Sequence, residues 1–431
     1  MEHLSRTDVA VIGGGLAGLT TAAYLARAGR SVLVLEKAGQ FGGRAITTEQ
    51  SGFLFNRGIH AFYQTGPGEA VLHELDVPYS ATSSGRSMYE AHYKDGIEPL
   101  PLNAETIRTS RLLNDQARAE LTRLLIGLKQ SDTTRWQGIS IQDWLEQSTT
   151  QPVVRRFFEA AVRLAMYTHA PELIDAGFAL HLITTQPPAL RINGGWQTLV
   201  NGLAQVARTA GANLQTGARV TAVEVGEQAH LVYLADGKTI EATTVVLATE
   251  PAVAARLVAH GQHALLRKLA EQTIPVYAAC LDIGIRPLPD PQRSVVLHFE
   301  RPLFYSVHSR DSDLAPAGGA LIHVVKYLRP NEKSDAQADR REMEEWLDRL
   351  QPGWRNVVVA QQYLPHMQVT GDMLQARRKG LAGRPEPAIP NVRNLYIVGD
   401  WVGQEDYLAN ASFASARQAS QLILANVPVQ Q

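Results

Sequence analysis

Residues 9–36 read VAVIGGGLAGLTTAAYLARAGRSVLVLE, which is an apolar strand, a glycine-rich turn, a helix rich in small residues and a second apolar strand that ends in an acid. Gly13, Gly15 and Gly18 have the G-x-G-x-x-G spacing of a dinucleotide-binding turn. The first glycine allows the sharp bend, the second lets the backbone approach a pyrophosphate, and the third lets the helix pack closely on the strand. Because strand, turn, helix, strand and acid all follow in order, the segment predicts a nucleotide-binding βαβ unit.

The nucleotide contacts follow from the same segment. Backbone N–H groups and the helix dipole hold phosphates at such a turn. This predicts cofactor contacts from Gly13, Gly15, Leu16, Ala17 and Gly18. Glu36 lies 18 residues beyond Gly18, where a carboxylate accepts both hydroxyls of an adenosine ribose, and Lys37 follows it. An acid at this position favours a 2′-hydroxyl over a 2′-phosphate, but it does not separate NAD from FAD.

The next segment, KAGQFGGRAITTEQSGFLFNRGIHAFY at residues 37–63, makes that distinction through a resemblance. A fingerprint followed by a GGR segment resembles the FAD-binding flavoprotein superfamily of amine oxidases, protoporphyrinogen oxidases and phytoene-type desaturases. RGIHAFY is similar to the GLH segment of plant-type carotenoid desaturases, whose backbone passes close to the isoalloxazine ring. The resemblance implies an FAD cofactor and the following neighbours: Gly42, Gly43, Arg44, Gly58, Ile59 and His60.

Residues 394–420, NLYIVGDWVGQEDYLANASFASARQAS, resemble the other half of the same cofactor site. In the superfamily, the Gly-Asp pair binds the ribityl and phosphate region, which here implies Gly399 and Asp400. The following helix points its N-terminus at the pyrimidine edge of the flavin, where negative charge gathers on reduction. DYLANA resembles the KYLASM region of plant-type phytoene desaturases, which adds Tyr407 and Leu408 as cofactor neighbours.

A third segment, residues 191–251, resembles the superfamily's second FAD segment, in which the backbone near Val220 meets the adenine. It reads as an amphipathic helix, a strand, a hairpin around Asp236-Gly237 and a closing strand. We therefore predict an α/β fold with a discontinuous, Rossmann-like FAD-binding domain and a substrate domain that combines a helical lid with a mixed sheet. The FAD domain is assigned to residues 1–63, 191–251 and 386–431, and the substrate domain to residues 64–190 and 252–385.

Within the substrate domain, residues 105–130 carry apolar residues at helical spacing, and Ser140 is a helix N-cap signal. Residues 152–183 resemble the helical lid of carotenoid-type desaturases, and their Phe, Met and Tyr side chains either form core or line a tunnel. The stretch 274–328 contains four segments typical of strands. The pocket is expected between lid, sheet and flavin.

Composition excludes several classes of protein. The 431 residues carry a formal net charge of −1 and are 45% hydrophobic, which gives no electrostatic footprint for nucleic acid. The chain has no 18-residue apolar run and no charged-then-apolar leader before Asp8, so we predict a cytoplasmic protein with at most peripheral membrane contact. The only cysteine, Cys280, excludes an internal disulfide, and no metal-ligand spacing is present. The oligomeric state is left open.

The chemistry follows from having one dinucleotide fingerprint and no second one for a nicotinamide. The substrate itself is then the expected reductant, losing a hydride to the flavin and a proton from the neighbouring atom. Dioxygen or a quinone-like acceptor is expected to reoxidise the flavin. The predicted proton-handling residues are His60, Tyr407 and Lys326, the last because amine oxidases often carry a lysine that holds water against the flavin. Alternatively, His60 hydrogen-bonds backbone and Lys326 faces solvent. Tyr407, together with Trp401, either frames an aromatic cage for an amine, packs apolar substrate or caps the helix.

Two functions remain in contention. The favoured one is a desaturase or dehydrogenase of a lipophilic, isoprenoid-like compound, because the GIHAFY, DYLA and lid segments resemble that branch. The alternative is a flavin amine oxidase that forms an imine. The same fold also serves non-redox flavin mutases and escort proteins that bind no FAD, but the well-formed fingerprint and Arg44 argue against the escort proteins.

Overall fold

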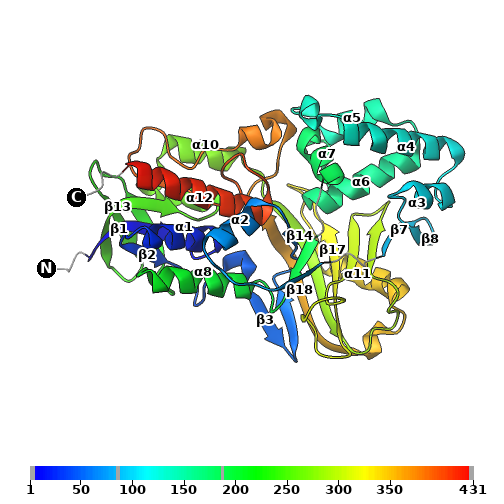
Figure 1. The fold of residues 1–431 in the computed structure, drawn as a ribbon, viewed down its shortest axis with the longest axis horizontal. Helices are drawn as coiled ribbons and strands as arrows, with labels where there is room; N and C mark the ends of the chain where they lie inside the picture. Colours follow the sequence, from blue (N-terminus) through cyan, green and yellow to red (C-terminus); the bar gives the residue numbers. More distant parts are fainter. Residues whose placement is uncertain (1–4, 84–87, 186–188, 427–431) are drawn as a thin grey trace.

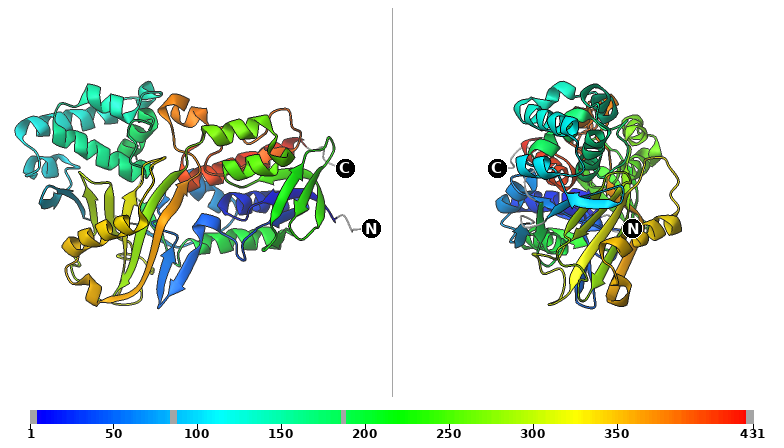
Figure 2. Two further views of the ribbon diagram at one scale, coloured as in Figure 1. Left: turned by 180° about the vertical axis from the view of Figure 1, so that it is seen from behind. Right: turned by 90° about the vertical axis from the view of Figure 1, so that its right-hand side faces the viewer.

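The computed structural model describes residues 5–83, 88–185 and 189–426. Two large sheets stand side by side along the long axis of the molecule, each covered by helices on both faces (Figure 1). Seen from behind, the two halves again lie side by side, with the helices of residues 104–185 above the second sheet, whereas in the end-on view the halves overlap (Figure 2). The fold is α/β with mixed sheets, as predicted.

The first sheet has the strand order β10-β2-β1-β13-β12-β11, and β19 pairs with β13. Its centre is parallel, whereas β12 joins β11 and β13 in an antiparallel meander. The apolar runs of the central strands are buried on both faces, as parallel strands under helices require. The strand bounds are β1 Ser5–Ile12, β2 Val32–Leu35, β10 Asn213–Gln215, β11 Val220–Glu224, β12 His230–Leu234, β13 Thr239–Leu247 and β19 Leu395–Ile397.

Helices cover both faces of this sheet. On one face, α1 (Leu16–Arg27), α2 (Pro67–Glu74), α8 (Gln197–Thr209) and α12 (Leu408–Asn426) bury apolar side chains against β1 and β2. On the other, α9 (Pro251–Leu257) and α10 (Ala264–Gln272) pack on β11 to β13. Residues 67–74 and 252–272 therefore pack with the nucleotide-binding half rather than with the substrate domain to which the sequence assigned them. The reason is tertiary, because their apolar faces match the open faces of the first sheet.

The second sheet has the order β18-β14-β17-β16-β15-β7-β8 and is mixed, because β15 runs parallel to β7 while its other pairs are antiparallel. The four strands predicted between residues 274 and 328 are present as β14 to β17. The long β18 was not predicted. The bounds are β7 Tyr89–Tyr93, β8 Gly96–Pro99, β14 Val276–Ile285, β15 Val295–His298, β16 Leu303–Val307, β17 Ala320–Tyr327 and β18 Val358–Thr370.

One face of the second sheet is covered by α11 (Ala336–Leu350), and the other by five helices, together called the lid, which include the segment 152–183 predicted as a lid. The helical stretch 105–130 is two helices, because Asn114 caps a new one by accepting from the N–H of Ala117. Ser140 caps the next helix as predicted. The lid helices are α3 Ala104–Thr109, α4 Asp115–Gln130, α5 Ile141–Ser148, α6 Pro152–Met166 and α7 Ala176–Thr185.

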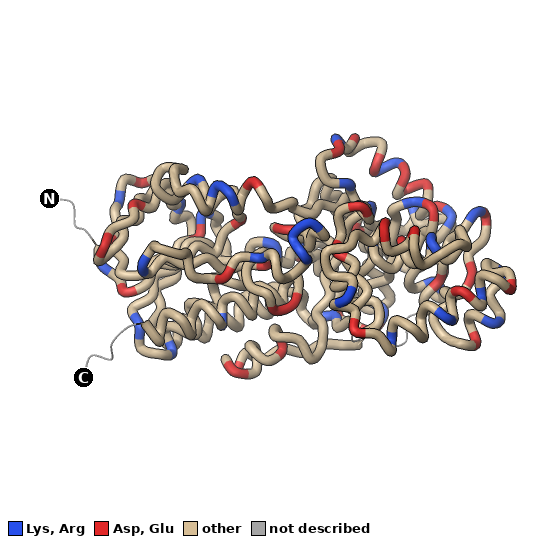
Figure 3. The backbone as a smooth tube through the Cα atoms, turned by 90° about the horizontal axis from the view of Figure 1, so that it is seen from above, with Lys and Arg blue, Asp and Glu red and all other residues tan. Residues whose placement is uncertain are grey.

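Two small sheets lie where the halves meet and carry the loop at residues 57–61. They are formed by β3 (Thr47–Gln50) with β4 (Phe53–Asn56), and by β5 (Phe62–Tyr63), β9 (Ala189–Ile192) and β6 (Ala81–Ser83). Short 3₁₀ helices complete the chain: η1 Gly43–Ala45, η2 Thr133–Trp136, η3 Ala259–Gly261, η4 Trp354–Asn356, η5 Ala376–Arg378 and η6 Gly380–Gly383. Acidic and basic residues are interspersed over both halves (Figure 3).

Candidate functional site

The glycine-rich turn forms a cradle in which Gly13 and Gly18 leave no room for a side chain. Gly13 has φ +112°, and a Cβ placed on it would lie 2.3 Å from the carbonyl oxygen of Ala248. A Cβ on Gly18 would lie 2.0 Å from the carbonyl oxygen of Gly13. Gly15 is different, because the nearest atom to its Cβ position is 3.9 Å away and it caps α1 without a side-chain hydrogen bond. The turn is therefore tight on the protein side and open on the other, where the N-terminus of α1 can receive a phosphate.

The ribose and adenine contacts predicted from distant segments come together next to this turn. Glu36 is 8% exposed and accepts hydrogen bonds from the N–H groups of Gly14 (2.7 Å) and Ala38 (2.8 Å). The N–H of Ala218 donates to the carbonyl oxygen of Glu36 (2.8 Å), which brings the start of β11 at Val220 to the same place. Two bonds leave the carboxylate with further acceptor capacity for ribose hydroxyls. Lys37 is exposed beside it.

Arg44, on η1, forms the charged centre of the site. Its guanidinium donates to Asp400 Oδ2 (2.7 Å) and to the carbonyl oxygen of Val369 (2.9 Å), and lies 3.5 Å from Glu250 Oε1. Burial opposes ionisation of Asp400, but the attraction and hydrogen bond of Arg44 outweigh it and hold the pKa of this carboxyl below its usual value. Burial raises the pKa of Glu250, with Arg44 acting against it. Asp400 is thus a carboxylate at neutral pH.

The second oxygen of Asp400 shows what the site accepts. Oδ1 is buried and has no hydrogen-bond partner of standard geometry among the described residues, although the Thr370 hydroxyl lies near enough to help lower the pKa of this carboxyl. Gly399, which precedes Asp400 with φ +147°, donates its N–H to Ser415 Oγ of α12 (3.0 Å). A buried carboxylate oxygen without a donor is costly, and a ligand hydroxyl would satisfy it. Three features therefore fit a flavin dinucleotide that extends from Gly15 towards Asp400. They are the open glycine cradle, the carboxylate of Glu36 for the ribose and the unpartnered oxygen of Asp400.

His60 holds the loop that follows β4 in place. One ring nitrogen lies 3.0 Å from the carbonyl oxygen of Gly58, and the other lies 3.1 Å from that of Arg44. Burial lowers the pKa of His60, and these backbone contacts act in the opposite direction. Gly58 has φ +80°, and a Cβ there would lie 2.1 Å from Met367 Sδ. The sequence left open whether His60 handles protons or hydrogen-bonds backbone, and the structure shows the backbone hydrogen bonds. Ile59 lies in the same loop.

Tyr407 closes the far side of the site, immediately before α12. It is 4% exposed, its hydroxyl donates to the carbonyl oxygen of Met166 (3.4 Å), and its ring contacts Phe178 edge-on at 6.1 Å. Burial raises the pKa of Tyr407, so the phenol stays protonated. Tyr407 therefore forms a wall of the site and donates a hydrogen bond, and its proton-handling role stays a prediction.

Lys326 is a correction to the sequence analysis. Its ammonium binds Asp339 Oδ1 and Glu342 Oε2 of α11, both at 2.6 Å. On β17, the alternate residues His323, Val325 and Tyr327 face β14 side chains and the lid, so Lys326 belongs to the opposite face. It neither reaches the site nor points freely into solvent. The structure brings together the other predicted residues and leaves this one out.

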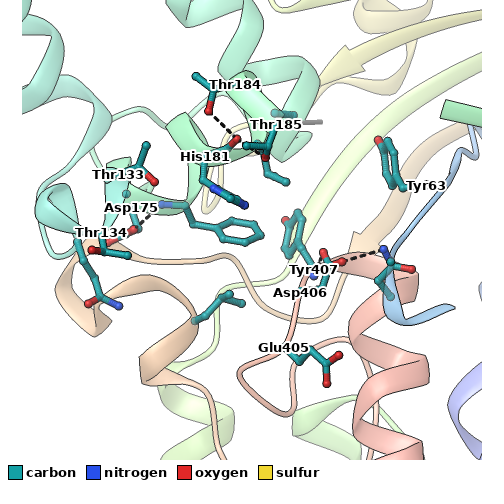
Figure 4. Close-up of a pocket in the computed structure, with 18 of the residues that line it drawn as sticks. Tyr63, Thr133, Thr134, Asp175, His181, Thr184, Thr185, Glu405, Asp406 and Tyr407 are labelled. Atoms are coloured by element: carbon teal, nitrogen blue, oxygen red, sulfur yellow. Dashed lines mark hydrogen bonds between the residues drawn. The ribbon is translucent and has the colours of Figure 1, made fainter. Parts of the chain in front are cut away.

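A pocket of about 870 Å³ opens beside Tyr407 and Leu408 (Figure 4). Figure 4 shows its side chains coming from the segment after β5, from η2 and α7 of the lid, and from the residues before α12. Its apolar wall includes Ala165, Phe178, Leu182, Leu381, Tyr407 and Leu408. Its polar lining includes Thr133, Thr134, Asp175, His181, Thr184, Thr185, Glu405 and Asp406. The pocket is therefore amphipathic, and it adjoins the helix end that the flavin is expected to meet.

Sequence reasoning missed several residues of this region. Glu250 comes just after β13, and a polar residue at the carboxyl end of a parallel strand is a signal that could have identified it. Met367 and Val369 lie on β18, which has no local motif. Asp282 and His323 form a buried pair with Nδ1–Oδ1 at 2.5 Å, visible only once β14 and β17 are placed side by side.

The chain belongs to the flavin-containing amine oxidoreductase family, whose model matches residues 16–424. One of the subunits of limonene dehydrogenase from Castellaniella defragrans is 54% identical over 63 residues, which is 15% of this chain and 11% of that protein. The chloroplastic 15-cis-phytoene desaturase of Arabidopsis thaliana is 24% identical over 273 residues, covering 56% of this chain and 47% of that protein. The matched regions thus cover less than half of these curated relatives.

Solved structures match over the whole chain. An oxidoreductase from Methanosarcina mazei has a TM-score of 0.76 at 20% identity, covering 97% of this chain and all of that one (100%). Wild-type putrescine oxidase bound to putrescine has a TM-score of 0.75 at 15% identity, covering 98% and 99% of the two chains. At these identities the likeness defines the fold alone.

Two further features concern metals and membranes. Across residues 5–83, 88–185 and 189–426, no group of three or more His, Cys, Asp or Glu side chains is arranged to hold a metal ion. Among the helices of the same residues, none combines the length and apolar character needed to cross a bilayer.

Proposed function

We propose that this protein is an FAD-dependent oxidoreductase that removes a hydride and a proton from a lipophilic, isoprenoid-like substrate, acting as a desaturase or dehydrogenase. The observation that carries the proposal is the junction at the start of α12. There Tyr407, which lines the 870 Å³ pocket and directly precedes α12, lies within electrostatic range of the Arg44–Asp400 pair. A dinucleotide entering from Gly15 would end beside a pocket large enough for a small organic substrate.

Each part of the chain has a task in this proposal. The glycine cradle and Glu36 would hold the ADP half, and Asp400 would bind the ribityl hydroxyls. Bound FAD supplies the hydride acceptor. The N-terminus of α12 would stabilise the negative charge that develops on reduction. Tyr407 and Phe178 would orient the substrate's apolar body and keep water out.

The lid-facing side of β14 and β17, which lacks the lysine expected of an amine oxidase, favours carbon–carbon oxidation over amine oxidation. On the sheet face towards the lid, β14 contributes Ala278, Cys280 and Asp282, and β17 contributes His323 and Val325. None of these is a lysine. Local similarity to the limonene dehydrogenase of Castellaniella defragrans, and to the carotenoid 3,4-desaturase of Haloarcula japonica at 53% identity over 58 residues, supports the same branch. Electron transfer to dioxygen or a quinone-like acceptor, peripheral membrane contact and a cytoplasmic location remain predictions.

The test is an anaerobic reduction experiment on the purified full-length protein. The FAD-loaded protein is mixed with a panel of monoterpenes and short prenyl alcohols, and separately with primary and secondary amines, while flavin absorbance is recorded. We expect bleaching by the isoprenoid panel and recovery of colour on admission of dioxygen or a soluble quinone. Bleaching by amines alone would establish the amine oxidase alternative. A protein that cannot be loaded with FAD would refute the oxidoreductase proposal and favour an escort-type protein.

A further inference from the structure

Arg191 is a cation placed inside the protein without an anion among the described residues. It lies on β9, where its neighbours Leu190 and Ile192 are buried in the core around α1 and α8. Because side chains alternate along a strand, Arg191 extends from the other face of this small sheet. Tyr63 of β5 lies on that same face, since Phe62 pairs with Leu190 and belongs to the same core. Arg191 therefore points towards the tyrosine that lines the pocket.

The guanidinium lacks hydrogen-bond partners. Its Nη1 is buried and unpartnered, and no hydrogen bond or ion pair links the Arg191 side chain to another described residue. Thr82, its partner in the register of β6, has a buried Oγ1 that is also unpartnered. Two neighbouring donors are thus left without an acceptor, which is rare for buried groups.

Tyrosine hydroxyls surround this position. Tyr63, Tyr89 and Tyr167 lie within electrostatic range of Arg191, and the hydroxyls of Tyr63 and Tyr167 are 3.2 Å apart. Burial lowers the pKa of Arg191, but the ordinary pKa of a guanidinium is so high that the group stays charged at neutral pH. Burial raises the pKa of Tyr63, so its hydroxyl stays protonated. The cluster therefore places one positive charge among tyrosine hydroxyls, which both donate and accept, and the unpartnered Nδ1 of His308, and it contacts the pocket through Tyr63.

We propose that Arg191 and Thr82 form a subsite for a carboxylate carried by the substrate, so that the natural substrate is a lipophilic acid. This inference rests on the proposed function. A single guanidinium balances the single charge of a carboxylate and can bind both of its oxygens in a planar fork. A phosphate or diphosphate carries more charge than one arginine neutralises. The apolar body then extends along Tyr63 towards Phe178 and Tyr407.

The test compares three ligands with the same ten-carbon chain. Geranate, geraniol and geranyl phosphate are titrated into the FAD-loaded full-length protein, with flavin absorbance and calorimetry as readouts. We expect geranate to bind about tenfold or more tightly than geraniol. Arg191→Met should remove this preference and leave geraniol binding unchanged. Arg191→Lys should retain part of the preference for geranate, because lysine keeps the positive charge but lacks the planar pair of N–H donors. Thr82→Val should weaken geranate binding about threefold.

Controls keep the result decisive. Arg108→Met, at an exposed arginine on α3, should bind all three ligands like the wild type. Circular dichroism checks that Arg191→Met is folded. If it is not folded, the comparison is made with Thr82→Val and Arg191→Lys. The proposal is overturned if the affinity for geranate is the same in the wild type and in the Arg191 and Thr82 variants. It is also overturned if the protein prefers geranyl phosphate and this preference depends on Arg191. If geranate binds through Arg191 but no isoprenoid reduces the flavin, the proposed function fails and the subsite stands.

Discussion

Replacing Gly18 by Ala sets two physical effects against each other. Gly18 is inside α1, so helix propensity alone predicts that alanine stabilises the protein by about 1 kcal/mol. However, the new Cβ would lie 2.0 Å from the carbonyl oxygen of Gly13, which is backbone and has to move. Overpacking of this kind costs about 1–3 kcal/mol. Because a backbone atom must shift, we place the cost at the upper end and expect a net destabilisation of about 1–2 kcal/mol.

The same shift should weaken FAD binding, because Gly13 forms the turn that receives the pyrophosphate. A loss of about 1.4 kcal/mol in binding corresponds to a tenfold weaker affinity. The assay is urea denaturation of the apoprotein together with FAD titration followed by flavin fluorescence. Both quantities are measured because the steric argument predicts that they fall together.

Gly127→Ala is the matched control. Gly127 is also helical, in α4, but a Cβ placed on it meets no atom within 4 Å. It should therefore show the propensity gain of about 1 kcal/mol without any change in FAD affinity. If Gly18→Ala gains stability as Gly127→Ala does and binds FAD normally, the tight contact between α1 and the turn does not exist and the reasoning is refuted.

Three further outcomes are expected. Asp400→Asn should weaken FAD binding about 10- to 100-fold, because a charged acceptor is lost; unchanged affinity in a fluorescence titration would contradict the placement of the ribityl chain. Lys326→Met should leave FAD affinity and flavin reduction unchanged while costing about 0.5–1 kcal/mol in urea denaturation, and a loss of flavin reduction would return Lys326 to the site. His298 has its pKa lowered to about 3, chiefly by burial, so the unfolded chain binds its proton first and stability should fall as pH drops below 6.5. His298→Gln should flatten that decline between about pH 6.5 and 5, and an equally steep decline in the variant would rule out this histidine as its source.

The parts that the sequence predicted well are those whose chemistry is local. A sharp turn, a close backbone approach and a helix start each need particular residues at fixed spacing, so Gly13, Gly15 and Gly18 indicate the nucleotide cradle on their own. The hairpin of β12 and β13 and the Ser140 cap were predicted for the same reason. Residues 67–74 and 252–272 were assigned to the wrong half because an amphipathic helix shows that it has a partner, but not which sheet the partner is.

Lys326 shows where local reasoning ends. Nearly every residue of β17 is buried, because α11 covers one face of its sheet and the lid covers the other. A strand buried on both faces has no hydrophobic alternation, so its sequence does not reveal which face a given side chain joins. The register of β17 against β14 decides which face each side chain joins. It places His323 opposite Asp282 and directs Lys326 to the face covered by α11.

The sequence by itself predicted a dinucleotide site at residues 13–36, because the expected contacts to the phosphates and ribose come from one contiguous βαβ unit. Its resemblances indicated that the dinucleotide is a flavin. Only the tertiary structure decided what surrounds that dinucleotide. Arg44 and Asp400 are 356 residues apart in the chain yet form the charged centre of the site. Thr82 and Arg191 become neighbours only through the pairing of β6 with β9. Contacts of this kind depend on how separate strands pair and pack, which no local pattern records.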